Sequence, residues 1–199
     1  MNEKISEMTD LNLRYQIKVN ELCLPLQHLK ISYFSFFSIY PLEDAKKLLI
    51  ICPNTSFLRQ YFYRKYYLYD PHIVDPNKLE EGAALWSAYS NSNYQGKYLY
   101  KLKENFGIDN GLSLIRKNQT KCYIFCFGVS KTNTRFFYNI FRNVVLLKCF
   151  TDYFLNEGNK IIEGFSKSSI DICDLKGKGF FLQKGISQGF KVKNPIKLI

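Results

Sequence analysis

Residues 133–156 have the regular apolar spacing of a long amphipathic helix, and Gly158 follows as a stop signal. The apolar side chains recur at a period of 3.6 residues, which is typical of a helix with a broad face on a protein core. That face comprises Phe136, Phe137, Ile140, Phe141, Val144, Val145, Leu147, Phe150, Phe154 and Leu155.

Two pairs of segments rich in β-branched and aromatic residues predict four strands. The first pair, 31–40 and 47–52, flanks a turn that begins at Pro41 and forms a predicted hairpin. The second pair, 111–116 and 121–129, flanks a polar turn. Cys122 and Cys126 would share one face of the last strand, roughly 13 Å apart, so we expect core packing rather than a disulfide.

Helices are predicted between and before these strands. Residues 11–29 carry a loose helical stripe that Pro25 interrupts. A second helix should begin at a cap, Thr55 or Ser56, and end before Asp70. A third covers 94–106, and a short helix around 83–89 is also possible. The order indicates an α+β fold, an antiparallel sheet with helices on its faces.

The length of 199 residues suits one domain plus a tail. From about Gly164 the chain becomes rich in Gly and Lys, and no acidic residue follows Asp174. We therefore expect a domain over 1–163 and a basic tail over 164–199. The formal net charge of +11 would attract nucleic acid or anionic membrane, or simply reflect a solvated lysine-rich surface.

The expected cellular location and the expected kind of site follow mostly from motifs that the sequence does not contain. The six cysteines are scattered, no signal peptide is evident, and no apolar run is long enough to span a membrane, so we expect a cytoplasmic protein without disulfides. The only histidines are His28 and His72. Asp70, His72 and Asp75 lie close together but match no metal spacing, and no nucleophile motif appears. We predict no metal, no cofactor and no enzymatic activity.

One stretch gathers rings and a carboxylate near a helix end: Phe57, Tyr61, Asp70 and Trp86, the only tryptophan. An apolar pocket with one anionic acceptor would suit a ligand that has an apolar tail and an N–H donor. Alternatively, the rings belong to the core and Asp70 caps a turn before Pro71.

The spacing of Phe57, Tyr61, Asp70-Pro71 and Trp86, followed by Gly107 and Gly111, resembles the autoinducer-binding domain of LuxR-type transcription regulators over roughly residues 12–160. The resemblance implies an α-β-α sandwich with about five antiparallel strands, similar to PAS and GAF sensors, so that a fifth strand would lie in 72–90. It also implies that Asp70 accepts the amide N–H of an acyl-homoserine lactone, with Tyr61 and Trp86 as pocket walls.

Two positions depart from the family pattern. Phe57 stands where the family usually has a Trp that donates to the lactone, and Pro53 stands where it usually has a Tyr. A phenylalanine ring has no hydrogen-bond donor, so the pocket would be altered or lost. The tail is also too short for the helix-turn-helix half of such regulators, so direct DNA binding is not expected.

Together these features predict a LuxR-like, quorum-sensing-type sensor domain in transcription regulation. It would act as a homodimer or as a heterodimer with a LuxR-type regulator, with or without a small amphipathic ligand. Two alternatives stay open. One is a nucleic-acid- or membrane-associating module that uses the lysine-rich tail. The other is a degenerate remnant that folds but has no function.

Overall fold

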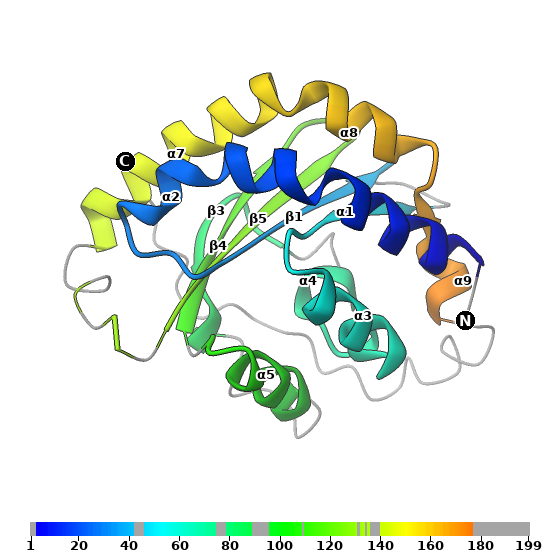
Figure 1. The fold of residues 1–199 in the computed structure, drawn as a ribbon, viewed down its shortest axis with the longest axis horizontal. Helices are drawn as coiled ribbons and strands as arrows, with labels where there is room; N and C mark the ends of the chain where they lie inside the picture. The colour runs from blue at the N-terminus through cyan, green and yellow to red at the C-terminus, as the bar shows by residue number, and fades with distance from the viewer. Residues whose placement is uncertain are drawn as a thin grey trace.

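The computed structural model describes residues 3–41, 46–74, 79–88, 96–108, 110–130 and 140–176, together with 132, 133 and 135. Within these residues the chain forms a six-stranded antiparallel sheet in the order β3-β4-β5-β1-β2-β6 (Figure 1). The strands are β1 (Tyr33–Tyr40), β2 (Lys47–Ile51), β3 (Gly82–Leu85), β4 (Asn110–Lys117), β5 (Cys122–Val129) and β6 (Ile170–Asp171).

Helices cover both faces of this sheet, so the predicted α-β-α sandwich is confirmed. In Figure 1, α7 and α8 lie over one face with α1 and α2 beside them, and α3, α4 and α5 lie on the other side. The helices are α1 (Glu3–Leu22), α2 (Leu24–Gln27), α3 (Thr55–Tyr63), α4 (Pro71–Val74), α5 (Gly96–Asn105), α7 (Ile140–Glu157), α8 (Asn159–Ser166) and α9 (Ile172–Lys176), with 3-10 turns η1 (Tyr66–Leu68) and η3 (Trp86–Ala88).

The sheet separates two apolar clusters, because successive side chains of a strand point to opposite faces. On β1, Tyr33 and Phe37 belong to the cluster beneath α3, whereas Phe34 and Phe36 belong to the cluster beneath α7 and α8. All four side chains are buried. A strand buried on both faces is mostly apolar, and in β1 only the buried Ser35 and Ser38 interrupt the aromatic and aliphatic residues.

The predicted strands and helices are present within the described residues, but α1 begins at Glu3 rather than at residue 11, and α3 ends at Tyr63. Two further local corrections concern the α3 cap and strand β3. Asn54, rather than Thr55 or Ser56, caps α3, because its side chain accepts a hydrogen bond from the Phe57 amide. The short helix considered around 83–89 is instead strand β3 followed by η3, since Gly82–Leu85 pairs with β4. This is the additional strand expected in 72–90, and the two-residue β6 makes the sixth.

The predicted domain boundary between 163 and 164 falls inside α8. Residues 164–176 continue into β6 and α9, and they bury Phe165, Ile170, Ile172 and Leu175 in the two clusters. This part of the predicted tail therefore packs with the sheet. The remainder, 177–199, lies outside the described residues. Across the described ranges, no helix combines the length and apolar character needed to cross a membrane.

A buried asparagine joins α1 to the sheet. The Asn12 side-chain amide donates to the carbonyls of Met8 and Ile50, both at 2.9 Å, and its oxygen accepts from the Cys52 amide at 2.7 Å. The last two bonds satisfy the backbone where β2 ends. Unpaired backbone groups at such a buried position would cost about 1–3 kcal/mol each.

Gly111 on β4 allows Trp86 to lie close against the sheet. A Cβ atom at this position would lie 2.3 Å from the Phe127 carbonyl oxygen and 2.7 Å from two carbons of the Trp86 ring. We expect Gly111→Ala to lower the free energy of unfolding by about 3 kcal/mol, because neither the strand backbone nor the buried indole has room to move. Urea denaturation followed by circular dichroism measures this change.

Gly164→Ala in α8 is the matched control. The nearest atom to its added Cβ is the Tyr15 hydroxyl at 3.4 Å. Alanine favours the helix over glycine by up to about 1 kcal/mol, so this variant should unfold at equal or higher urea concentration. Equal stability of the two variants would show that Trp86 does not pack on Gly111 as described.

Candidate ligand-binding pocket

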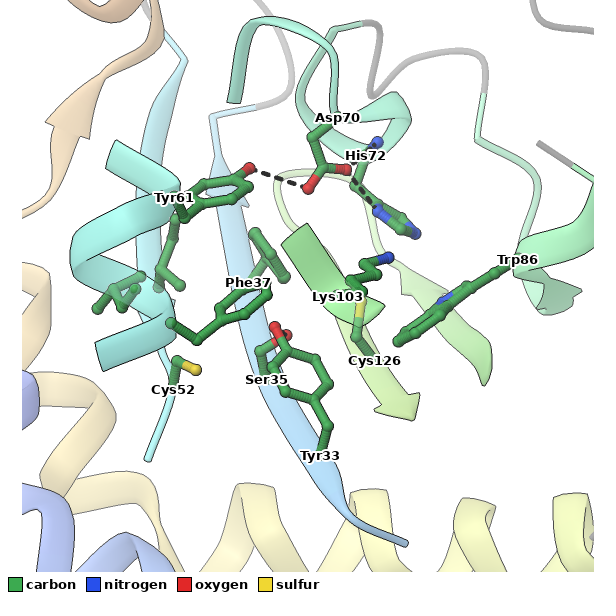
Figure 2. A pocket seen from close by; sticks show the side chains of 13 residues that line it. Tyr33, Ser35, Phe37, Cys52, Tyr61, Asp70, His72, Trp86, Lys103 and Cys126 are labelled. Atoms are coloured by element: carbon green, nitrogen blue, oxygen red, sulfur yellow. Dashed lines mark hydrogen bonds and ion pairs between the residues drawn. The ribbon is translucent and has the colours of Figure 1, made fainter. Parts of the chain in front are cut away.

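A buried pocket lies between α3 and the sheet, and all four sequence-predicted residues, Phe57, Tyr61, Asp70 and Trp86, line it (Figure 2). Its free volume is only about 10 Å³, which is room for about one water molecule. The wall is therefore closely packed. The other lining residues are Tyr33, Ser35, Phe37, Ile50, Cys52, Leu58, His72, Lys103 and Cys126.

Asp70 provides a buried carboxylate at one end of this pocket. It immediately precedes α4, and three hydrogen bonds hold it. The Tyr61 hydroxyl donates to Oδ2 at 2.9 Å, and the His72 amide and ring Nδ1 bond to Oδ1 at 3.0 and 2.7 Å. A carboxylate offers about four acceptor sites, so these bonds use three of them. Asp70 both caps the turn into α4 and faces the pocket.

The same carboxylate begins a chain of polar side chains that reaches the sheet. Because an ionised carboxylate only accepts, His72 Nδ1 carries a proton. The other ring nitrogen, Nε2, lies 2.8 Å from the Ser113 hydroxyl on β4. Ser113 Oγ in turn accepts from the Trp86 indole N–H at 3.0 Å and lies 3.4 Å from the Cys126 sulfur. The register that pairs Ser113 with Cys126 across β4 and β5 positions both groups.

The distances along Asp70, His72 and Ser113 match those of a serine hydrolase triad. Ser113, however, is fully buried and is not among the residues that line the pocket. Its oxygen also accepts the Trp86 N–H, so the nucleophilic lone pairs are not directed toward a substrate. The chain of hydrogen bonds therefore connects α4, η3 and β4 and does not present a nucleophile.

Lys103 contributes a buried ammonium from α5. The residue is only 8% exposed, and its Nζ atom lies 3.6 Å from the centroid of the Trp86 ring. Burial lowers the pKa of Lys103, although the Asp70 charge acts in the opposite direction. In Figure 2 the ammonium points into the space between Asp70 and Trp86. An ammonium over an aromatic face gains a cation–π attraction.

The remaining titratable side chains of the pocket are neutral at physiological pH. Burial raises the pKa of both Cys52 and Cys126 to about 12. Burial also raises the pKa of Tyr33 and Tyr61 well above the usual value of 10.0. The charges at this site therefore come from Asp70, Lys103 and, when it is protonated, His72.

Sequence reasoning missed Lys103 and Ser113 and considered His72 only as a metal ligand. For Lys103 a signal was present, since it follows Leu102 and precedes Phe106 by three residues on the predicted apolar side of its helix. Asp75, the third member of the metal hypothesis, lies outside the described residues. Among the residues that are described, no group of three or more His, Cys, Asp or Glu side chains is placed to hold a metal ion.

Phe57 fills its position with aromatic packing. Its ring centroid lies 5.0 Å from that of Tyr33 and 5.4 Å from that of Phe106, both in edge-to-face geometry. Phe57 and Tyr33 both line the pocket, so the first of these contacts lies in its wall. The backbone carbonyl of Pro53, the second departure from the family pattern, accepts from the Gln16 side chain at 2.8 Å and so contributes to the contact between α1 and α3.

Comparisons with known proteins give structural matches at low sequence identity only. No protein-family model matches the chain, and no curated protein matches its sequence. Among solved structures, SdiA of Escherichia coli is 16% identical with a TM-score of 0.47, covering 57% of this chain and 48% of that one. SdiA in complex with octanoyl-rac-glycerol is 16% identical, with a TM-score of 0.45, covering 65% of this chain and 55% of that one.

CepR2 of Burkholderia cenocepacia, an N-acylhomoserine lactone dependent LuxR family transcription factor, is 13% identical, with a TM-score of 0.44, covering 64% of this chain and 77% of that one. The chain spans about half the length of the two SdiA chains.

Because folding lowers the pKa of Asp70, the stability of the protein falls at acid pH. Burial alone would raise its pKa, but the charges of His72 and Lys103 and the hydrogen bonds from His72 lower it from 3.8 to about 2. A pKa lowered by folding stabilises the native state above the unfolded pKa, and this contribution disappears as the pH falls through about 2. The contribution is about 2 kcal/mol at neutral pH.

We therefore expect the stability of Asp70→Asn, measured by urea unfolding, to change less between pH 5 and pH 2.5 than that of the original protein. The control is Asp152→Asn, since Asp152 is 61% exposed and pairs with Arg116 at the surface. Parallel pH profiles for the original protein and Asp70→Asn would contradict the lowered pKa.

Proposed function

We propose that this chain is a small-molecule-sensing domain of the LuxR type that acts in transcription regulation. The observation that carries the proposal is the buried carboxylate of Asp70 at the end of an apolar pocket, with one acceptor site left beyond its three hydrogen bonds. Such a group can orient a ligand through an N–H or O–H donor while the apolar wall takes its tail. Phe57, Tyr61, Asp70 and Trp86 are the proposed binding residues.

The pocket is altered relative to one for an ordinary acyl-homoserine lactone. Sites for drug-sized ligands enclose roughly 300–1,000 Å³, whereas the free space here is about 10 Å³. Phe57 supplies no donor for a lactone carbonyl. A ligand therefore has to displace lining side chains, and its binding free energy must exceed the free energy that this displacement costs. We infer weak binding, or none, for common acyl-homoserine lactones and better binding for slimmer acyl compounds.

The proposed sensor acts through a partner, which is either a second copy or a LuxR-type regulator. Support comes from apolar side chains that are exposed on α7, where Leu146 is 45% exposed and Val145 is 56% exposed. On α1, Ile17 is 74% exposed. A contiguous patch of such residues would be typical of a contact surface.

The test is thermal melting of the purified chain with a panel of acyl-homoserine lactones, simple acyl amides and octanoyl glycerol, which is the ligand of the SdiA complex. A compound that binds only the folded state raises the melting temperature. We expect a rise of at least about 2 °C with one class of acyl compound at saturating concentration, and a loss of that rise in Asp70→Ala.

Asp152→Ala serves as the matched acidic control and should retain the full response. A folded protein that responds to no compound in the panel would contradict the sensor proposal and favour a remnant that has kept the fold alone. A response that is unchanged in Asp70→Ala would exclude the carboxylate as the anchoring group.

A further inference from the structure

Helix α3 has an exposed side opposite the one that lines the pocket. Its apolar residues are buried, and the exposed positions recur at intervals of three and four residues, as on an amphipathic helix. The exposed residues of the helix and its C-cap are Ser56, Arg59, Gln60, Tyr63 and Arg64. Lys65, the next residue, is exposed as well. In Figure 1 this helix lies on the other side of the sheet from α7.

The exposed side of α3 is strongly basic. Between Asp44 and Asp70 the sequence has five lysines and arginines and no acidic residue. Within the part of the chain that the structure describes, Arg59, Arg64 and Lys65 form no ion pair with a carboxylate. These three cations and Tyr63 are called the basic face of α3 below. A cluster of cations without carboxylate partners attracts a polyanion.

An exposed aromatic ring lies among these cations. Tyr63 is 76% exposed, and the guanidinium carbon of Arg64 lies 5.6 Å from the centroid of its ring. Surfaces that bind single-stranded nucleic acids combine such rings, on which bases stack, with positive groups that contact the phosphates. The bases of a duplex are already stacked on one another, so the ring of Tyr63 favours a single strand.

The backbone conformation of Lys65 is a separate indication. Lys65 has a φ of 56° and a ψ of 34°, which is the left-handed region. The position after a helix C-cap is usually glycine when it takes this conformation, because a Cβ atom is unfavourable there. A lysine at this position lowers stability relative to glycine and adds a charge to the basic face. Backbone strain of this kind is concentrated at functional sites.

From these observations we propose that the basic face of α3 binds single-stranded RNA. RNA presents unpaired bases in its loops and ends, and aromatic rings and guanidinium planes stack on them. A base stacks on Tyr63, and the neighbouring phosphates accept charge-assisted hydrogen bonds from the three cations. Arg59 and Arg64 are about 7.5 Å apart along the helix axis, so they contact different phosphates. The inference goes beyond the proposed sensor function and does not depend on a ligand in the pocket.

The test is fluorescence anisotropy of a labelled oligouridine of about ten nucleotides, titrated with the full chain at several salt concentrations. We expect Tyr63→Ala to weaken binding at least about fivefold, because a stacked base is lost. Tyr63→Phe keeps the ring and should bind within about twofold of the original protein. Replacing both Arg59 and Arg64 by Gln should reduce the slope of log K against log salt by about 1.4, since each phosphate contact on a single strand contributes about 0.7.

Matched controls come from α7. Arg142 and Lys148 are exposed there, and replacing both by Gln removes the same charge from the opposite side of the sheet. Tyr153→Ala removes a ring that is 40% exposed. We expect both control variants to bind oligouridine within about twofold of the original protein. Each variant is first melted by circular dichroism to establish that it folds.

Lys65→Gly gives a test in which stability and binding change in opposite directions. Glycine relieves the left-handed backbone, so this variant should unfold at a higher urea concentration than the original protein. It also removes one phosphate contact, so oligouridine should bind at least about twofold more weakly. Higher stability with unchanged affinity would show that Lys65 takes no part in binding.

Three results would overturn the proposal. The first is that the original protein does not bind oligouridine at low salt. The second is that the α3 and α7 variants lose affinity alike, which would assign the binding to net charge or to the lysine-rich segment after residue 176. The third is tighter binding to duplex DNA of the same length, or to phosphatidylserine vesicles, than to oligouridine. The response to the acyl compounds tests the sensor function separately, because those compounds bind on the other side of α3.

Discussion

The buried carboxylate of Asp70 is the interaction on which the pocket side of this fold depends. A charge that is 4% exposed must be paired and hydrogen-bonded, because an uncompensated buried charge costs about 3–5 kcal/mol. Tyr61 and His72 form hydrogen bonds with the carboxylate directly. His72 also lies within hydrogen-bond distance of Ser113 on β4, and Ser113 accepts a hydrogen bond from Trp86. One charge thereby sets the relative positions of α3, α4, η3 and the sheet.

The sequence predicted those parts of the fold that depend on local pattern. The strands 31–40 and 121–129 were predicted because they are rich in β-branched and aromatic residues, a composition that suits strands buried on both faces. Strand β3 was not predicted from its own residues, since Gly82–Leu85 is short and lacks β-branched residues; only the family resemblance implied a strand in 72–90. Its strand conformation comes from pairing with β4. The α3 cap shows the same limit, because several residues that favour caps stand in a row.

The residues of the candidate site also fall into two groups, those predicted from the sequence and those that only the structure shows. Phe57, Tyr61, Asp70 and Trp86 were found from their spacing, which reflects their places on α3, at the start of α4 and on η3. The partners that complete the site come from distant parts of the chain: His72 meets Ser113 across 41 residues, and Trp86 meets Ser113 across 27. A lysine in a helix usually faces water, so the position of Lys103 on the apolar side of its helix was a weak signal, and the folded packing shows that the side chain is buried.

Strand β1 contributes side chains to both sides of the sandwich. Tyr33, Ser35 and Phe37 line the pocket, and the intervening Phe34 and Phe36 pack against Phe154 of α7 with ring centroids 5.0 and 5.4 Å apart. A strand is a single rigid backbone, and a shift or twist on one side is transmitted to the other. A displacement of β1 on the pocket side would therefore also move Phe34 and Phe36 against Phe154 of α7.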